Sequence, residues 1–232
     1  MEEKLSLLHA KFKLNKWFKY FSYLCRFLLA AGFIPSGMQK VLGYRFTSLP
    51  VDHPMGHYLD ALYQTGFYYT TIGVFQVLAA ILLLIPRTAL LGALLYLPII
   101  FNITVLSIAV RFDGSLVTSP LMVLACLYIL FWNYDRLKYV LPFKSSSITK
   151  EKIHPLPFRS AQVRWIFAGF FGFALGLTVL IHSSIDVFPR NTQRDCKTQF
   201  SEEEWSNHGE TFCSCIHQEG RSLKECLEAI EK

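Results

Sequence analysis

The feature that most constrains this chain is a set of long apolar runs without a charged side chain. Four runs of 18 to 23 residues contain no Asp, Glu, Lys or Arg, at residues 67–86, 88–110, 116–133 and 165–182. A helix of about 20 apolar residues crosses a hydrocarbon core of about 30 Å. In a soluble protein these runs would form a large core, but the remaining polar chain is too short to cover it. We therefore predict membrane-spanning helices.

A fifth run, at residues 19–38, is apolar except for Lys19 at its start and Arg26 within it. Arg26 lies seven residues into the run, or about 10 Å at 1.5 Å per residue. An arginine at this depth extends toward the interface or faces the interior of a helix bundle. The alternative is a cleaved signal peptide, but the long lead-in carries Glu2 and Glu3 and no small-residue cleavage site follows. We count this run as the first of five spans.

The distribution of basic residues predicts the orientation of the spans. The chain has a net charge of +6, a surplus that fits nucleic-acid binding, an anionic membrane surface or the inner loops of a membrane protein. With an inner amino terminus, 13 Lys and Arg lie in inner segments and 6 lie outside, counting the first twenty residues of the tail. We therefore expect a cytoplasmic amino terminus, an outer carboxyl terminus and no nucleic-acid partner.

Four of the six cysteines lie in the last forty residues, at Cys196, Cys213, Cys215 and Cys226. An even cluster in a short polar tail predicts two disulfides, which require an oxidising compartment such as a periplasm. Pairing Cys213 with Cys215 would close a strained ring, so Cys196 and Cys226 should each bond one of them. This agrees with the outer carboxyl terminus.

The tail should form a small helical module. Capping-box spacings at residues 201–204 and 222–225 predict two short helices, with Gly220 between them. Such a hairpin has little apolar area, and cross-links are the usual remedy. His208 and His217 flank Cys213 and Cys215, which leaves metal binding and thiol exchange as alternative interpretations. No zinc or C-x-x-C redox spacing is present, so we expect structural disulfides and no metal.

Two amides lie at similar depth in neighbouring spans. Gln76 is about 13 Å and Asn102 about 12 Å from the expected outer ends of their runs. Pro98 frees a backbone carbonyl one turn before Asn102. Polar side chains at depth are candidates for a functional site, although many only hydrogen-bond neighbouring helices. We expect Gln76 and Asn102 to meet or to line one cavity.

The outer loop at residues 39–66 contains His53, His57 and Asp60. At i and i+4 the two histidines suit a metal site or a proton relay at a cavity mouth. Pro54 and Gly56 argue against a regular helix between them, so a solvated loop is the alternative that we favour.

Composition shifts divide the chain into five parts. We expect a basic amphipathic cytoplasmic segment (1–18), a four-helix transmembrane bundle (19–140), a cytoplasmic linker (141–164), a fifth transmembrane helix (165–182) and a periplasmic Cys-rich helical tail (183–232). The first and third parts are basic and suit anionic headgroups of the lipid bilayer. The predicted fold is all-α and integral to the membrane.

Several features of residues 20–140 occur in a recognisable order: Arg26 early in the first span, the Gly37–Lys40 segment at its end, and the hairpin of the next two spans. In this order they resemble the DoxX-like family of bacterial inner-membrane proteins. The turn at residues 112–115 and the exit at 133–136 also resemble members from the Bacteroidetes side. The fifth span and the Cys-rich tail are additions to this pattern.

The resemblance implies a four-helix bundle in the inner (plasma) membrane and a link to quinone-dependent oxidoreductases. It places Arg26 and Lys40 among the polar residues of the bundle, while Gln76 stands where several relatives look acidic, and an amide cannot titrate. We expect a small apolar cavity, open outward, lined by Arg26, Lys40, Gln76 and Asn102, in a membrane subunit of a redox system. Quinone is the cofactor implied, and the sequence assigns no catalytic residue.

A rival hypothesis is a non-enzymatic anchor or assembly protein. Its disulfide-stapled tail would recruit a periplasmic or membrane redox partner, and Gly172 and Gly176 in the fifth span form a small-x-x-x-small pair suited to helix docking. A transporter is a weaker third hypothesis because the spans show no inverted repeat.

Overall fold

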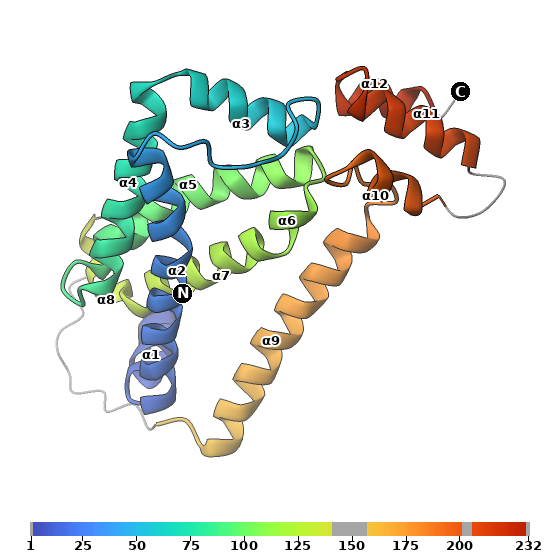
Figure 1. Ribbon diagram of the computed structural model, residues 1–232. Helices are drawn as coiled ribbons and strands as arrows, with labels where there is room; N and C mark the ends of the chain where they lie inside the picture. Colours follow the sequence, from blue (N-terminus) through green and yellow to red (C-terminus); the bar gives the residue numbers. More distant parts are fainter. Residues whose placement is uncertain (1, 141–156, 201–205, 231–232) are drawn as a thin grey trace.

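The protein is entirely helical in the part of the chain that the structure describes. The computed structural model describes residues 2–140, 157–200 and 206–230 (Figure 1). The helices are α1 (Glu2–Lys13), α2 (Lys16–Val41), α3 (Pro54–Gln64), α4 (Phe67–Leu84), α5 (Ala89–Ala109), α6 (Asp113–Leu116), α7 (Thr118–Trp132), α8 (Tyr134–Val140), α9 (Ser160–Ser183), α10 (Gln193–Thr198), α11 (Ser206–His217) and α12 (Leu223–Glu228).

Five of these segments are long and apolar enough to cross a membrane: α2, α4, α5, the continuous α6–α7 segment and α9. The five predicted spans are therefore confirmed, with shifted boundaries. The first span begins at Lys16 because Asn15 caps it, its side chain accepting from the Trp17 backbone N–H at 2.9 Å. The fifth begins at Ser160, within the stretch expected to be linker. The rest of that linker, 141–156, lies outside the described residues.

α2, α4, α5 and α7 form a bundle whose most extensive contact is between α2 and α4. Gly37 and Gly73 face each other where these two helices cross, and a Cβ added to either would lie within 3 Å of the other's carbonyl oxygen. Ala79, Ala80 and Ala93 in α4 and α5 are fully buried. Small side chains let helix backbones approach closely, which is the usual source of packing between membrane helices.

A buried aromatic pair fixes α5 against α2. The rings of Phe33 and Tyr96 stack with centroids 3.6 Å apart, and the Tyr96 hydroxyl donates to the Leu29 carbonyl at 3.2 Å. Tyr96 is fully buried, and a buried tyrosine hydroxyl needs such a partner. The hydrogen bond therefore satisfies the Tyr96 hydroxyl inside the apolar core.

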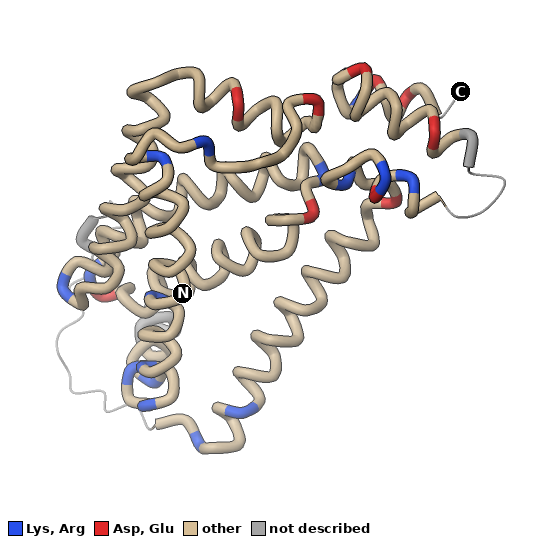
Figure 2. The backbone as a smooth tube through the Cα atoms, viewed as in Figure 1, with Lys and Arg blue, Asp and Glu red and all other residues tan. Residues whose placement is uncertain are grey.

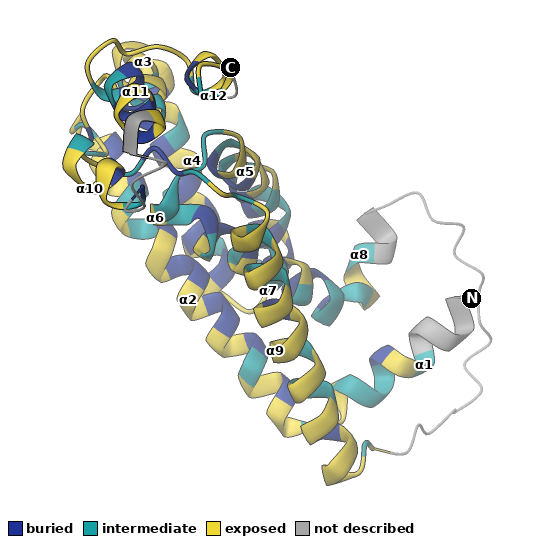
Figure 3. Ribbon diagram, turned by 90° about the vertical axis from the view of Figure 1, so that its right-hand side faces the viewer, coloured by how far each residue is buried: buried dark blue, intermediate teal, exposed yellow. Residues whose placement is uncertain are grey.

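α9 contacts the bundle mainly through its first half. Phe167 packs on Phe18 and Phe21 of α2, with centroids 5.1 and 5.3 Å apart. Farther along, Phe173, Leu175 and Leu180 are more than 60% exposed, and α9 runs along the outside of the bundle (Figure 3). These apolar side chains contact the lipid bilayer, because apolar surface of this extent is not stable in water.

The bundle has two polar ends. α1, the turn between α4 and α5, and α8 lie at one end, called here the amino end, and α3, α6 and α10–α12 lie at the other, the tail end (Figures 1 and 2). At the amino end His9 Nδ1 lies 3.2 Å and Lys13 Nζ 2.9 Å from the two carboxylate oxygens of Asp135. The sides expected to be inner and outer therefore correspond to two separate surfaces.

The expectation that Pro54 and Gly56 argue against a regular helix in the loop at 39–66 is wrong, because residues 54–64 form α3. Pro54 and Gly56 lie inside α3, where Pro54 occupies the first turn and thus removes an N–H that has no helical partner. His53 caps the helix, accepting from the Met55 N–H at 3.1 Å. A side chain at Gly56 would collide with the Pro50 carbonyl oxygen. Both residues that argued against a helix are therefore used to begin one.

Candidate functional site

Arg26 points into the bundle near its amino end. The side chain is 5% exposed, and its Nε has no hydrogen-bond partner within the described part of the chain. The guanidinium carbon lies 5.5 Å from the centroid of the Tyr23 ring. The guanidinium of Arg136 is near enough to repel it. Arg26 is thus a buried cation whose described surroundings include an aromatic ring and a second cation.

Lys40 is buried at the other end of α2. Its Nζ donates to the Ser36 carbonyl at 3.1 Å and lies 4.1 Å from the centroid of the Phe46 ring. A cation over an aromatic face is stabilised by the ring quadrupole. Arg26 and Lys40 are fourteen residues apart on one helix, which corresponds to about 21 Å. They therefore do not share a single site.

Gln76 lies beside the crossing of α2 and α4. Its Cβ would be 3.1 Å from a Cβ added to Gly37, and the side chain is 2% exposed. Its Oε1 has no hydrogen-bond partner in the described chain. An unpaired buried carbonyl costs about 1–3 kcal/mol, so packing alone does not explain the presence of Gln76 in the bundle.

Asn102 lies on the exposed side of α5. Among the described residues no hydrogen bond joins Asn102 to Gln76. The two side chains also differ in burial, because Gln76 is buried and Asn102 is exposed. The buried polar positions of α5 are Thr104 and Ser107, whose hydroxyls donate to backbone carbonyls one turn earlier at 2.8 and 2.7 Å. The structure thus places Gln76 and Lys40 near one crossing, Arg26 at the far end, and Asn102 on the surface.

His53, His57 and Asp60 are held in three different environments. His53 is 1% exposed, His57 is exposed, and Asp60 lies 3.2 Å from Arg45 Nε and accepts from Gln64 at 2.7 Å. The described residues contain no group of three His, Cys, Asp or Glu side chains placed to hold a metal ion. The arrangement stabilises α3 and its connection to the preceding loop.

His53 also contacts the tail. Its ring centroid lies 6.1 Å from that of His217 in α11. Burial, followed by the nearby His217, lowers the pKa of His53 from 6.5 to about 4, against the opposing effect of a hydrogen bond that its ring makes to the Arg190 backbone. His53 is therefore neutral at ordinary pH, which its role as a helix cap requires, because the capping nitrogen must accept a hydrogen bond.

The tail docks on the tail end of the bundle through contacts that the sequence did not reveal. Arg190 Nη1 lies 2.7 Å from Asp113 Oδ2, and Arg111 donates to the Val187 carbonyl at 2.9 Å. His217 lies 2.8 Å from the Pro189 carbonyl and so orders the connection between α9 and α10. These pairs are 28 to 77 residues apart, and no local pattern marks them.

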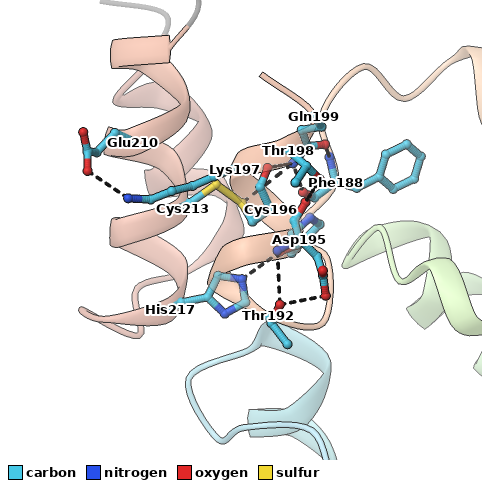
Figure 4. The surroundings of a disulfide bond; sticks show 11 residues. Phe188, Thr192, Asp195, Cys196, Lys197, Thr198, Gln199, Glu210, Cys213 and His217 are labelled. Carbon is cyan, nitrogen blue, oxygen red and sulfur yellow. Dashed lines mark hydrogen bonds and ion pairs between the residues drawn. A yellow bond between two sulfur atoms is a disulfide. The ribbon is translucent and has the colours of Figure 1, made fainter. Parts of the chain in front are cut away.

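The tail contains two disulfides, Cys196–Cys213 and Cys215–Cys226. Each joins an outer cysteine to one member of the central pair, as the spacing predicted. Figure 4 shows Cys196–Cys213 between α10 and α11, with an ion pair of 2.8 Å between Lys197 and Glu210 beside it. This ion pair lowers the pKa of Glu210. Cys213, Cys196 and Cys226 are fully buried with Phe212 in a small separate core.

The helix boundaries in the tail partly follow the prediction. Ser222 caps α12 through the Glu225 N–H, and Gly220 has a positive φ of 62° between the two helices. α10 was not predicted; Thr192 caps it, its side chain accepting from the Asp195 N–H at 3.1 Å. The capping box at 201–204 lies outside the described residues.

A cleft of about 680 Å³ lies where α9 approaches the start of α2. Its walls combine aromatic, aliphatic and polar side chains: Asn15, Trp17, Phe158, Ser160, Val163, Arg164 and Phe167. Phe167 also lines a second, apolar pocket of about 140 Å³ with Phe12, Phe18, Phe21, Tyr128, Phe131, Ile166 and Phe170. The larger volume falls in the range of about 300–1,000 Å³ typical of small-molecule sites. No local sequence pattern marks this cleft, because its walls come from segments about 140 residues apart in the chain.

Comparison with known proteins finds a relative most of whose length is matched by this chain. The uncharacterized protein YwoB of Bacillus subtilis (strain 168) is 33% identical over 141 residues, which cover 55% of this chain and 85% of YwoB. No protein-family model matches the chain, and no solved structure matches it. At this identity and coverage, the chain belongs to the same family of multi-span helical membrane proteins as YwoB.

Proposed function

We propose that this protein is a DoxX-like membrane subunit of a quinone-linked redox system and that it holds an isoprenoid quinone between α2 and α9. The observation that carries the proposal is the cleft of about 680 Å³ with Trp17, Phe158 and Phe167 in its walls. A quinone combines a flat ring with a long apolar chain. Aromatic side chains suit the ring, and the lipid-facing surface of α9 suits the chain.

Polar groups at the cleft suit the oxygens of a quinone. Arg164 and Ser160 are exposed at the start of α9. Asn15 uses its carbonyl oxygen to cap α2, which leaves its NH₂ group to donate. Quinone carbonyls only accept hydrogen bonds, and these three side chains all supply donors. Arg26, Lys40, Gln76 and Asn102 do not line this cleft, and the outward-open cavity expected at them is not part of the proposal.

The experiment is a fluorescence titration of the purified full-length protein in detergent with decylubiquinone. We expect saturable quenching that Trp17→Phe largely removes and that Trp165→Phe leaves in place, since Trp165 is 77% exposed on α9 and does not line the cleft. Phe167→Ala should weaken binding at least fivefold, whereas Phe173→Ala, on the lipid-facing side of the same helix, should not. Quenching that does not saturate, or that is equal in all four variants, would contradict the proposal.

A second candidate is a membrane anchor that recruits a partner through its tail. It is favoured by the double disulfide in α10–α12 and by the charged side chains on its surface, including Arg221, Lys224 and Glu228. Deleting residues 190–232 separates the two functions. If the tail recruits a partner, the truncated protein should lose a co-purifying protein. If the quinone proposal is right, the truncated protein should still bind quinone, whether or not a partner is lost.

We also propose an inner-membrane location with a cytoplasmic amino terminus and a periplasmic tail. The support is the surplus of Lys and Arg in the segments of the amino end and the presence of disulfides at the tail end. The five-part division of the chain follows from this orientation. Fusion of alkaline phosphatase after the last residue should give active enzyme, and fusion in the turn after α4 should give inactive enzyme; the reverse result would invert the topology.

A further inference from the structure

Two hydrogen-bond donors on one face of α2 are buried and have no partner in the part of the chain that the structure describes. The Ser22 hydroxyl is 1% exposed and Arg26 is 5% exposed, and neither Ser22 Oγ nor Arg26 Nε has a hydrogen-bond partner in the described chain. The two residues are four apart, so their side chains lie on the same face, one turn from each other. Leaving such groups unpaired costs about 1–3 kcal/mol each and more for a charge.

The usual local partner of Ser22 is already in use. A helical serine commonly donates to the carbonyl four residues earlier, which here is that of Phe18. The Tyr128 hydroxyl from α7 donates to that carbonyl at 2.9 Å. Ser22 Oγ makes no hydrogen bond to this carbonyl or to any other atom of the described chain, so its hydroxyl is available to donate to a ligand.

The positive charge at this place has no ion-pair partner among the described residues. Arg136 repels Arg26 and is held in position because its Nη1 donates to the Arg87 carbonyl at 3.1 Å. Asp135 is the nearest described carboxylate in sequence to Arg136, and it faces His9 and Lys13. Two guanidinium groups and a hydroxyl thus gather at the amino end, and no described carboxylate forms an ion pair with them.

Ser22 and Arg26 lie in the first half of α2, five and nine residues after Trp17. The Arg26 backbone is therefore about 13 Å along the helix from Trp17. Trp17 and Trp132 lie at or beside the ends of α2 and α7, as is typical of residues at a membrane–water interface. Side chains on a helix lean toward its amino terminus, so Ser22 and Arg26 extend from this depth toward the headgroups at the amino end.

We propose that Ser22, Arg26 and Arg136 form a binding site for a phosphate group, with Arg26 as its deep donor and Arg136 at its entrance. The ligand is the phosphate of an anionic phospholipid or of a soluble phosphate ester. Guanidinium groups bind phosphate oxygens through paired, charge-assisted hydrogen bonds, and a hydroxyl supplies one more. The site is separate from the quinone cleft, which none of the three residues lines.

The test measures the thermal unfolding of the purified full-length protein in an uncharged detergent. One arm adds dioleoyl phosphatidylglycerol, with dioleoylglycerol as the lipid without phosphate, and another adds sn-glycerol 3-phosphate. We expect one of the phosphate compounds to raise the melting temperature and dioleoylglycerol not to do so. A shift with the lipid alone assigns a membrane source, and a shift with glycerol phosphate assigns a soluble ligand.

The variants separate binding from structure because the two effects have opposite signs. Arg26→Met and Ser22→Ala remove unpaired buried donors, so each should raise the melting temperature of the protein without ligand. Each should also increase the ligand concentration needed for half of the shift by at least fivefold. Lys19→Gln, an exposed basic position on the same helix, should change neither quantity.

Arg136→Gln is the second variant should Arg26→Met fail to fold, since Arg136 is exposed. It should weaken binding severalfold without loss of the fold. The proposal is overturned when neither phosphate compound shifts the melting temperature, or when both Arg26→Met and Arg136→Gln respond as the unmodified protein does.

Discussion

Arg190 reaches from the connection between α9 and α10 to Asp113 at the start of α6, with 2.7 Å between Nη1 and Oδ2. This ion pair joins the tail to the bundle across 77 residues of sequence. Arg111 reinforces it by donating to the Val187 carbonyl, and both Arg111 and Arg190 adopt a positive φ of 52°. The tail is therefore docked on one end of the bundle and does not merely follow the last span.

Breaking this ion pair should loosen the tail without unfolding the bundle. Both side chains are about one third exposed, so Asp113→Asn or Arg190→Gln should cost at most about 1 kcal/mol. Protease cleavage between residues 184 and 195 should become severalfold faster. Lys224→Gln, which removes the exposed ion pair Lys224–Glu228, should leave the rate of this cleavage unchanged. The charge swap Asp113→Arg with Arg190→Asp should restore slow cleavage; equal cleavage in all forms would show that other contacts hold the tail.

Loss of a disulfide should unfold the tail. Cys196 and Cys213 close a loop of 17 residues, and cross-links of this length stabilise by about 3 kcal/mol. The small core around Phe212 and Ile216 is too limited to replace that contribution. Cys196→Ser with Cys213→Ser should therefore abolish hydrogen-exchange protection in α10 and α11 and leave that of α2 and α4 unchanged. Cys25→Ala with Cys126→Ala, which removes the free thiols of the described chain, should leave the tail protected.

The sequence predicted the elements of this fold whose cause is local. Long apolar runs, four of them free of charge, determine the five spans, and the cysteine spacing limits the pairings, so both were confirmed. Docking of the tail was not predictable, because no local sequence pattern indicates that Asp113 and Arg190 form an ion pair. The cleft was missed for the same reason, since Trp17 and Phe167 meet only when α9 returns to α2. Arg26 and Gln76 were recognised as polar residues at depth, but their unpaired atoms become visible only in the packed bundle.

Acidification should weaken the contact between α3 and the tail. The pKa of His53 is about 4 when folded and 6.5 in an unfolded chain, so the unfolded state binds the additional proton between these values. Stability therefore rises with pH across this window and falls as pH is lowered from about 6.5 to 4, by roughly 3 kcal/mol in total. The quantity to measure is the melting temperature as a function of pH.

His53→Asn tests this assignment, because an asparagine oxygen can still cap α3 but does not titrate. The variant should show a flatter profile between pH 4 and 6.5. His57→Gln, at the exposed position on the same helix, should retain the slope of the unmodified protein. A His53→Asn profile as steep as the original would place the titrating group elsewhere.

The same substitution should have opposite effects at two glycines of the spans. A Cβ at Gly37 would lie 2.9 Å from the Gly73 carbonyl oxygen and 2.8 Å from a methyl group of Val77, whereas a Cβ at Gly172 in α9 has no neighbour within 4 Å. Gly37→Ala should therefore force α2 and α4 apart and cost about 1–3 kcal/mol. Gly172→Ala meets open space and should be neutral or stabilising by up to about 1 kcal/mol, because alanine is the better helix former. Melting temperatures in detergent compare the two. Equal changes would mean that α9 packs as tightly as the bundle, whereas a loss confined to Gly37→Ala places the close backbone contact at the crossing of α2 and α4, beside Lys40 and Gln76.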